Sequence, residues 1–354
     1  MKFAKRGTIA TVSMLLAASA SLVAVGPASA VGTESVGTES VETREFAPVN
    51  RPGPPLSVPK RRLAKSVRCT PDAPRAKRGV ALFVHGTTVT PRENFGWNWF
   101  PAMDKLDWPY CSVKMPNNAM SDIQVSAEYV VHAIRHVYRR SGREVDVLGH
   151  SQGGNVPRFA LRFWPDTRRM VDDYIGFAAT NHGSLSVNTM CPPIAGCAPA
   201  LWQQTLNSNY VRAMNSHQET FAGISYTNVY TRTDEFVQPN LDDTGTSSLR
   251  GGGGAITNIA IQDVCPANLT SEHIAVGTYD PTAYAIAIDA LTHTGPAKPA
   301  RVPGSACTQQ FMPGVNPAEF PGNYASTMNT IANQLVTYPR VSAEPPLKPY
   351  VFAR

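Results

Sequence analysis

Three short, mostly apolar segments impose the strongest constraint on how this chain folds. They are VALFV at 80–84, EVDVLGHS at 144–151 and DDYIGFAAT at 172–180. Each is too short for a helix, and strands that are apolar along nearly their whole length are typical of parallel sheets covered on both faces. The pattern predicts an α/β fold with a mostly parallel central sheet flanked by helices on both faces.

Helical segments lie between these strands. Apolar residues recur at helical spacing over 124–141, and Gly142 follows them, so we expect a helix of about four turns. A second helix is expected to begin at Gln152. His132 and His136 lie one turn apart on the first helix, but no acidic third ligand is nearby. We therefore predict no metal site there.

The second strand leads directly into the pattern G-x-S-x-G, which contains Ser151. The pattern is short enough to occur by chance, so its context decides its meaning. A serine at a sharp turn from strand to helix has an exposed hydroxyl, and the flanking glycines leave room for strand and helix to pack closely. It also lies at the positive end of the helix dipole. This context predicts that Ser151 is a nucleophile.

A serine nucleophile needs a histidine to take its proton and a carboxylate to orient that histidine. After this kind of turn the acid is expected before the histidine along the chain. A strand predicted at 225–230 is followed by Asp234, which we favour as the acid. Asp242 and Asp243 lie in a Gly/Ser-rich turn, and Asp263, just before a cysteine, is the weaker rival.

The base is expected on a loop after the next strand. That strand is predicted at 256–265 and leads to His273, which we favour as the base. His293 follows a helical run and should lie at its far end, whereas His182 and His217 precede the acid.

The negative oxygen of a tetrahedral intermediate needs donors that are already aimed at it. The backbone N–H of Gln152 is one expected donor. The second is expected from the loop after the first strand, through the backbone N–H and the hydroxyl of Thr87.

The N-terminal region is typical of an exported protein. Residues 1–30 carry early basic residues, an apolar run and a small-residue stop, as in a signal peptide rather than a membrane anchor. Residues 31–52 contain a duplicated polar phrase, which indicates a low-complexity leader or propeptide. Residues 53–354 are expected to form one catalytic domain.

Charge and cysteine content narrow the class of protein further. The formal net charge is +6, but no basic motif interleaved with aromatic residues supports nucleic-acid binding. The six cysteines of an exported chain are expected to form disulfides, and spacing alone leaves fifteen pairings open.

Several separate phrases together resemble the secreted serine lipases of the lipase B type, within the α/β-hydrolase superfamily. They are PPLSVPKRRL, FVHGTT, DIQVSAEYVVHAI, SQGG, APALWQQT, NVYTRTDEFVQP and DVC. The resemblance spans roughly residues 53–345.

The resemblance implies an α/β-hydrolase fold, no metal and no organic cofactor. It implies a triad of Ser151, Asp234 and His273, with an oxyanion hole from Thr87 and Gln152. It also supports the disulfides Cys69–Cys111 and Cys265–Cys307. The implied substrate is a lipophilic ester such as a glyceride, met at a lipid–water interface by a secreted monomer without stable membrane insertion.

Two substitutions depart from the family pattern in the expected substrate pocket. His150 stands where the family carries a tryptophan, and Thr180 stands where it carries an aspartate. The segment 184–200 is expected to cover the mouth of the pocket, stiffened by a Cys191–Cys197 bridge.

Three functions are thus in competition. The leading one is a lipase-type carboxylic-ester hydrolase that works through an acyl-enzyme. An acyltransferase or a polyester hydrolase would use the same triad. A catalytically retired, exported binding protein would keep the scaffold without the activity.

Overall fold

The structure, a computed structural model, describes residues 44–353. Within this range seven strands form one sheet in the order β1-β3-β2-β4-β5-β6-β7. β1 runs antiparallel to β3, and all other neighbouring strands are parallel. The strands are β1 (Val67–Cys69), β2 (Val80–Val84), β3 (Tyr110–Val113), β4 (Val145–His150), β5 (Val171–Phe177), β6 (Ser225–Tyr230) and β7 (Ala255–Ala260).

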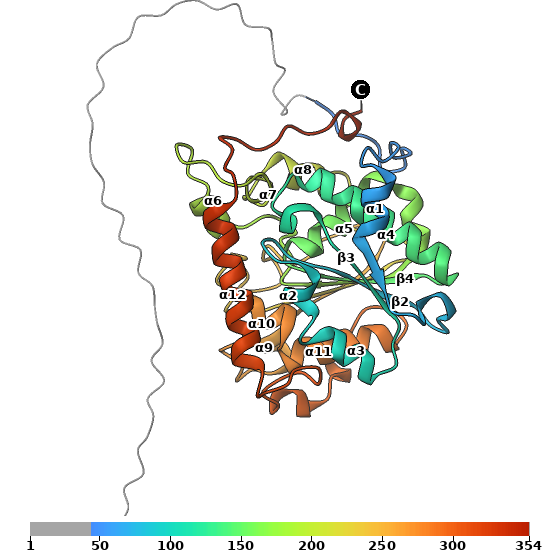
Figure 1. Cartoon of the computed structure of the whole chain (residues 1–354), viewed down its shortest axis with the longest axis vertical. Coiled ribbons are helices and arrows are strands. Elements are labelled where there is room, and N and C mark those ends of the chain that lie inside the picture. The colour runs from blue at the N-terminus through green and yellow to red at the C-terminus, as the bar shows by residue number, and fades with distance from the viewer. Residues whose placement is uncertain (1–43, 354) are drawn as a thin grey trace, which may run out of the picture. The chain divides into compact units, whose positions relative to one another are not determined.

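Helices cover both faces of the sheet, with α4 and α5 on one side and α3 and α11 on the other (Figure 1). The α-helices are α1 (Lys60–Ser66), α2 (Pro91–Phe95), α3 (Trp99–Lys105), α4 (Ile123–Ser141), α5 (Gln152–Phe163), α6 (Leu185–Met190), α7 (Pro199–Trp202), α8 (Asn209–Met214), α9 (Ile261–Val264), α10 (His273–Thr278), α11 (Pro281–Thr292) and α12 (Phe320–Thr337). The 3₁₀ turns are η2 (Ala73–Arg75), η3 (Pro116–Ala119), η4 (Pro165–Met170), η5 (Pro299–Arg301), η6 (Gly304–Cys307) and η7 (Pro349–Val351).

Strand β2 shows why the central strands are apolar throughout. Val80, Leu82 and Val84 belong to the core between the sheet and α4 and α5. The alternate residues Ala81 and Phe83 belong to the core on the opposite face. All five side chains are fully buried, so neither face of the strand has a place for a polar residue. The predicted parallel sheet covered on both faces is confirmed.

Two of the predicted strands end earlier than expected. β5 ends at Phe177, because Ala178 adopts a φ of 45° and turns the chain out of the sheet. β7 ends at Ala260 rather than at residue 265, and α9 follows. The Asp263 carboxylate accepts a hydrogen bond from the Ala260 N–H at 2.9 Å and so stabilises the first turn of that helix.

The helix predicted over 124–141 is confirmed and is longer than expected. α4 has 19 residues, or about five turns. The Asp122 side chain caps its first turn by accepting from the Gln124 N–H at 2.9 Å. Gly142 ends it with a φ of 66°, a left-handed conformation that glycine adopts without strain.

All three expected disulfides are present: Cys69–Cys111, Cys191–Cys197 and Cys265–Cys307. The first joins the antiparallel neighbours β1 and β3, where the two cysteines are paired in register. The third ties the end of α9 to η6.

The expected signal peptide, residues 1–30, lies outside the described residues, as does the expected leader up to residue 43. The remaining leader residues pack against the domain. The Ala47 N–H donates to the Val351 carbonyl at 2.8 Å, and the Phe46 ring stacks on Phe352. Arg168 donates to the Val49 carbonyl.

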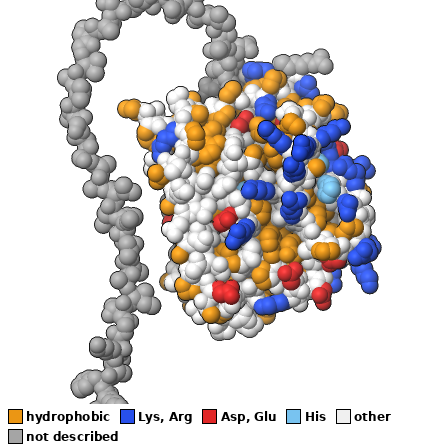
Figure 2. Space-filling view, viewed as in Figure 1, with side chains coloured by type: hydrophobic (Ala, Val, Ile, Leu, Met, Phe, Trp, Pro, Cys, Tyr) orange, Lys and Arg blue, Asp and Glu red, His pale blue; other side chains and the backbone are white. Residues whose placement is uncertain are grey.

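Exposed Lys and Arg side chains gather over α1 and the C-terminal end of α4 (Figure 2). Among the described residues, no helix combines the length and apolar character that crossing a membrane requires.

The contact between β4 and α5 generates a stability prediction. A Cβ added at Gly149 would lie 2.0 Å from the Gly153 carbonyl oxygen. We therefore expect Gly149→Ala to lower the free energy of unfolding by about 3 kcal/mol, measured by urea denaturation. Gly322→Ala, where an added Cβ meets nothing within 4 Å on α12, should instead raise it by up to about 1 kcal/mol. Equal stability of the two variants would contradict this account.

Candidate active site

Ser151 occupies a strained turn between β4 and α5. Its φ of 56° and ψ of −124° lie in a region that residues with a side chain rarely adopt. The Ser151 N–H donates to the Phe177 carbonyl at 2.8 Å, which anchors the turn to β5. The glycines of the motif are required because no side chain fits at their positions. A Cβ at Gly153, for example, would lie 2.0 Å from the Val84 carbonyl oxygen. The sharp strand-to-helix turn predicted for the motif is confirmed.

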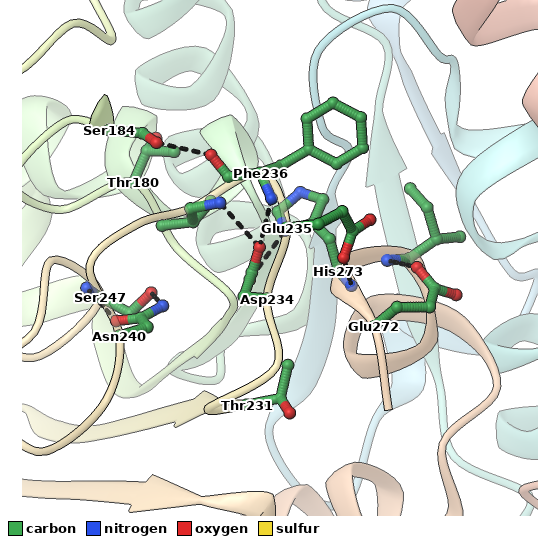
Figure 3. Close-up of polar contacts among 12 residues, drawn as sticks. Thr180, Ser184, Thr231, Asp234, Glu235, Phe236, Asn240, Ser247, Glu272 and His273 are labelled. Carbon is green, nitrogen blue, oxygen red and sulfur yellow. Dashed lines mark hydrogen bonds and ion pairs between the residues drawn. The ribbon is translucent and has the colours of Figure 1, made fainter. Parts of the chain in front are cut away.

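Asp234 and His273 meet as predicted. The His273 Nδ1 lies 3.0 Å from Asp234 Oδ2, and both side chains are almost wholly buried. The other carboxylate oxygen, Oδ1, accepts from the backbone N–H groups of Phe236 at 2.9 Å and Val237 at 2.7 Å (Figure 3). Asp234 is therefore held by its own loop, and one oxygen faces the imidazole.

The location of His273 differs from the expected loop. It is the first residue of α10, because the Glu272 carboxylate accepts from the N–H groups of Ile274 and Ala275 and caps the helix there. The His273 N–H donates to Glu235 Oε2 at 3.0 Å. His273 is thus fixed through its backbone as well as through its ring.

The electrostatics around His273 favour its charged form. Burial opposes a charge on the ring, but the carboxylates of Asp234, Glu235 and Glu272 outweigh burial and raise the pKa of His273 above 6.5. Glu235 and Glu272 were not singled out by the sequence reasoning. Their only signal was that each directly adjoins a predicted triad residue.

One pocket is lined by three of the five predicted triad and oxyanion residues; Asp234 and Gln152 do not line it. Ser151, His273 and Thr87 line it, as do His150 and Thr180, the two positions where the sequence departs from the family pattern. The pocket holds about 700 Å³ of empty space, part of it open to solvent. Within residues 44–353, no hydrogen bond joins the Ser151 hydroxyl to the His273 imidazole. Catalytic hydrogen bonds are often long before substrate binds.

A chain of hydrogen bonds leads from Asn155 to Thr87, one of the predicted oxyanion donors. The Asn155 amide donates to Thr180 Oγ1 at 2.6 Å, and that hydroxyl donates to Gln204 Oε1 at 3.0 Å. The Gln204 amide in turn donates to Thr87 Oγ1 at 3.1 Å. Because the Thr87 oxygen accepts this bond, its own proton is left for another acceptor. The side chain of the other predicted donor, Gln152, instead bonds the Ala119 carbonyl.

Gln204 belongs to the family-resembling phrase APALWQQT, but nothing in the sequence links it to Thr87. It lies 117 residues from Thr87 along the chain, and glutamine side chains serve many purposes. Only the folded arrangement identifies it as a neighbour of the site.

His150 lines the pocket and is buried and uncharged. Its Nε2 lies 3.1 Å from the His273 carbonyl oxygen, and its Nδ1 lies 3.1 Å from the Asn94 amide nitrogen. Burial, together with the nearby His273, lowers the pKa of His150 to about 3. A Cβ at Gly277 would overlap the His150 ring, so α10 packs directly on it.

Apolar side chains form the outer part of the pocket. Val187 and Met190 come from α6, Leu201 from α7, and Ile331 and Leu335 from α12. The expected cover at 184–200 thus contributes to the lining. Apolar side chains gather on the surface where α6 and α7 lie (Figure 2), and within that segment Leu185 and Ile194 are strongly exposed.

The rival acids and bases lie elsewhere. Asp263 pairs with Arg232 and caps α9, and Asp242 is exposed and bonds Thr244. His293 pairs with Asp289 at the end of α11.

His182 pairs with Glu219, while His217 bonds the Phe46 carbonyl. Asp243 is exposed on the same turn as Asp242.

Comparison with known proteins places this arrangement in a family. The family described as Lipase (class 2) matches residues 116–258, a range that contains Ser151 and Asp234. Lipase B of Pseudozyma antarctica is 30% identical over 299 residues, which cover 84% of this chain and 86% of that protein. The crystal structure of Aspergillus fumigatus lipase B matches with a TM-score of 0.78 at 28% identity, over 89% of this chain and 77% of that one. The chain belongs to the lipase B family and has the α/β-hydrolase fold of those lipases.

Proposed function

We propose that this member of the lipase B family hydrolyses lipophilic carboxylic esters through an acyl-enzyme formed on Ser151. The observation that carries the proposal is the bond between His273 Nδ1 and Asp234 Oδ2, beside a pocket that Ser151 and His273 both line. In the neutral ring, a carboxylate that accepts from Nδ1–H leaves Nε2 without a proton, so that nitrogen is able to act as a base.

The proposed reaction has two halves. The Ser151 Oγ attacks the acyl carbonyl while His273 Nε2 takes its proton, and the oxyanion is stabilised by the Gln152 N–H and by Thr87. His273 then returns the proton to the departing alcohol. Water attacks the acyl-enzyme with the same base, releasing the acid and restoring the Ser151 hydroxyl.

Substrate class follows from the lining of the pocket. Val187, Leu201 and Ile331 offer an apolar surface for an acyl chain, and polar groups are concentrated near Ser151. Exposed Leu185 and Ile194 at the same end favour contact with a lipid–water interface.

Two rival activities share this triad. An acyltransferase would replace water with an alcohol, and a polyester hydrolase would accept a polymer chain. A panel of p-nitrophenyl esters of increasing chain length, emulsified triglyceride and polyester film separates a lipase from a polyester hydrolase, and new ester formed when an alcohol is added indicates an acyltransferase. Rates confined to short soluble esters would contradict the lipase assignment.

We also propose that the protein is exported and acts as a monomer, with residues 1–30 as signal peptide, 31–52 as leader and 53–354 as catalytic domain, although the last part of that leader packs against the domain. The three disulfides support export, because disulfides persist in oxidising compartments.

The nucleophile is tested by covalent labelling. A fluorophosphonate probe should label the native protein at one site, and Ser151→Ala should abolish both labelling and ester hydrolysis. Ser247→Ala, at a buried serine that donates no bond to the triad, serves as the control and should be labelled normally. A native protein that resists the probe would favour the retired binding protein.

The pH dependence of hydrolysis reports on His273. Only the neutral ring accepts the serine proton, so kcat/KM should fall as the pH is lowered. Because the pKa of His273 is raised, the apparent pKa of this fall should lie above 6.5. Glu235→Gln removes one of the carboxylates and should move the fall to lower pH. A fall centred at or below pH 6.5 in the native enzyme would contradict this account.

The oxyanion role of Thr87 is tested by shape-matched variants. Thr87→Val removes the hydroxyl and should lower kcat by about 10²-fold, the effect of losing one oxyanion donor. Thr87→Ser keeps the hydroxyl and should stay within about tenfold of the native rate. Steady-state kinetics on one soluble ester measure both. Unchanged kcat in the valine variant would restrict the hole to backbone donors.

A further inference from the structure

Three carboxylates meet at the edge of the sheet opposite the pocket. Asp146 is the second residue of β4, and Asp172 and Asp173 are the second and third residues of β5. These are the amino ends of neighbouring parallel strands, whereas Ser151 follows the carboxyl end of β4. One ligand oxygen of each of the three carboxylates lies within 4.8 Å of the other two.

A β-bulge creates this cluster. Val145 pairs with Val171, but Val147 pairs with Tyr174, so Asp146 stands opposite two residues of β5 instead of one. Successive side chains of a regular strand point to opposite faces, and Asp172 and Asp173 would diverge. The extra residue brings both carboxylates to Asp146. Bulges of this kind recur where a strand redirects side chains for a purpose.

Two of the three carboxylates are buried without protein partners. Asp146 is 4% exposed and Asp173 is 7% exposed. Asp173 Oδ1 is buried with no hydrogen-bond partner. Across residues 44–353, no hydrogen bond or ion pair reaches the side chain of either residue. Buried carboxylates are normally paired with donors or cations, so the cluster lacks the group that would stabilise it.

The surroundings add negative charge. Burial, then the other acidic side chains, raise the pKa of Asp146 to about 7 and of Asp173 to about 8. Glu144 is among those acidic neighbours of Asp146. A Cβ at Gly79 would lie 2.2 Å from Asp146 Oδ2, so backbone packs directly against this carboxylate and holds it in place.

We propose that Asp146, Asp172 and Asp173 bind one Ca²⁺ ion, which stabilises the amino edge of the sheet. Carboxylate oxygens are the ligands that Ca²⁺ prefers, and oxygens that share an ion at its usual bond length lie no more than about 5 Å apart. Mg²⁺ retains much of its water and suits a buried, mostly dehydrated site less well. Asp172 is exposed and provides the route by which the ion enters.

This site is separate from the histidine pair considered in the sequence. His132 and His136 lie on α4 with ring centroids 5.8 Å apart and take no part in the cluster. No local pattern groups Asp146 with Asp172 and Asp173, because the bulge that joins them is a feature of strand pairing.

Thermal unfolding of the full protein tests the proposal. After treatment with EDTA and buffer exchange at pH 8, addition of CaCl₂ to saturation should raise Tm by about 5 °C, whereas equal MgCl₂ should raise it clearly less. Isothermal titration with CaCl₂ should give one site per chain. A native protein that shows neither the Tm rise nor bound Ca²⁺ would overturn the proposal and leave a proton shared between the carboxylates.

Variants locate the ion without relying on activity. Asp146→Asn and Asp173→Asn should lose the Ca²⁺ response, yet in EDTA they should be at least as stable as the native protein because a buried repulsion is removed. Asp242→Asn, at an exposed carboxylate, makes the same change of charge and should keep the response. A Ca²⁺ response retained by both cluster variants would overturn the assignment.

Hydrolysis of a soluble ester in EDTA at 25 °C should stay within about twofold of the rate in Ca²⁺, because the cluster lies at the opposite edge of the sheet from Ser151. Failure of the calcium site is thereby distinguished from failure of the proposed esterase activity.

Discussion

Helix α5 approaches β4 so closely that no side chain fits at Gly149, and it approaches the end of β2 so closely that none fits at Gly153. This contact forces Ser151 into a positive φ, and the bond from its N–H to Phe177 keeps it there. The strained backbone of Ser151 persists because the packed cores on both faces of the sheet hold β4 and α5 in place. A looser helix would let the turn relax, and the serine would lose its fixed position at the pocket.

The other parts of the site are arranged relative to that turn. β6 delivers Asp234 and the start of α10 delivers His273, so the three residues come from separate elements at the carboxyl edge of one sheet. Backbone N–H groups fix Asp234, and Glu235 fixes the main chain of His273. The site is therefore positioned mainly by backbone contacts, which tolerate little displacement of the loops.

Charge is distributed unevenly between the two edges of the sheet. At the carboxyl edge, acidic side chains surround a histidine that is able to take up a proton, and the neighbouring His150 stays neutral because it is buried. At the amino edge, no ion pair formed within residues 44–353 reaches the buried carboxylates of Asp146 and Asp173. At the carboxyl edge the buried carboxylate of Asp234 is thus hydrogen-bonded by groups of the protein. At the amino edge the buried carboxylates are left to an outside ligand.

Much of this protein was readable from local sequence. The apolar strands, the turn at Ser151 and the choice of Asp234 and His273 as partners follow from patterns within a few residues, because burial on both faces and a sharp turn restrict which residues fit. The ends of β5 and β7 and the position of His273 at the start of a helix were not predicted. Each depends on a single helix-capping side chain or on one residue with a positive φ. The Thr87–Gln204 contact and the Asp146 cluster were beyond reach, because pairing register and loop packing bring together residues far apart in the chain. Sequence by itself determined the strands, the strand-to-helix turn and the candidate site residues. Tertiary structure decided which side chains face one another, because only close packing selects among the many distant partners that local patterns allow.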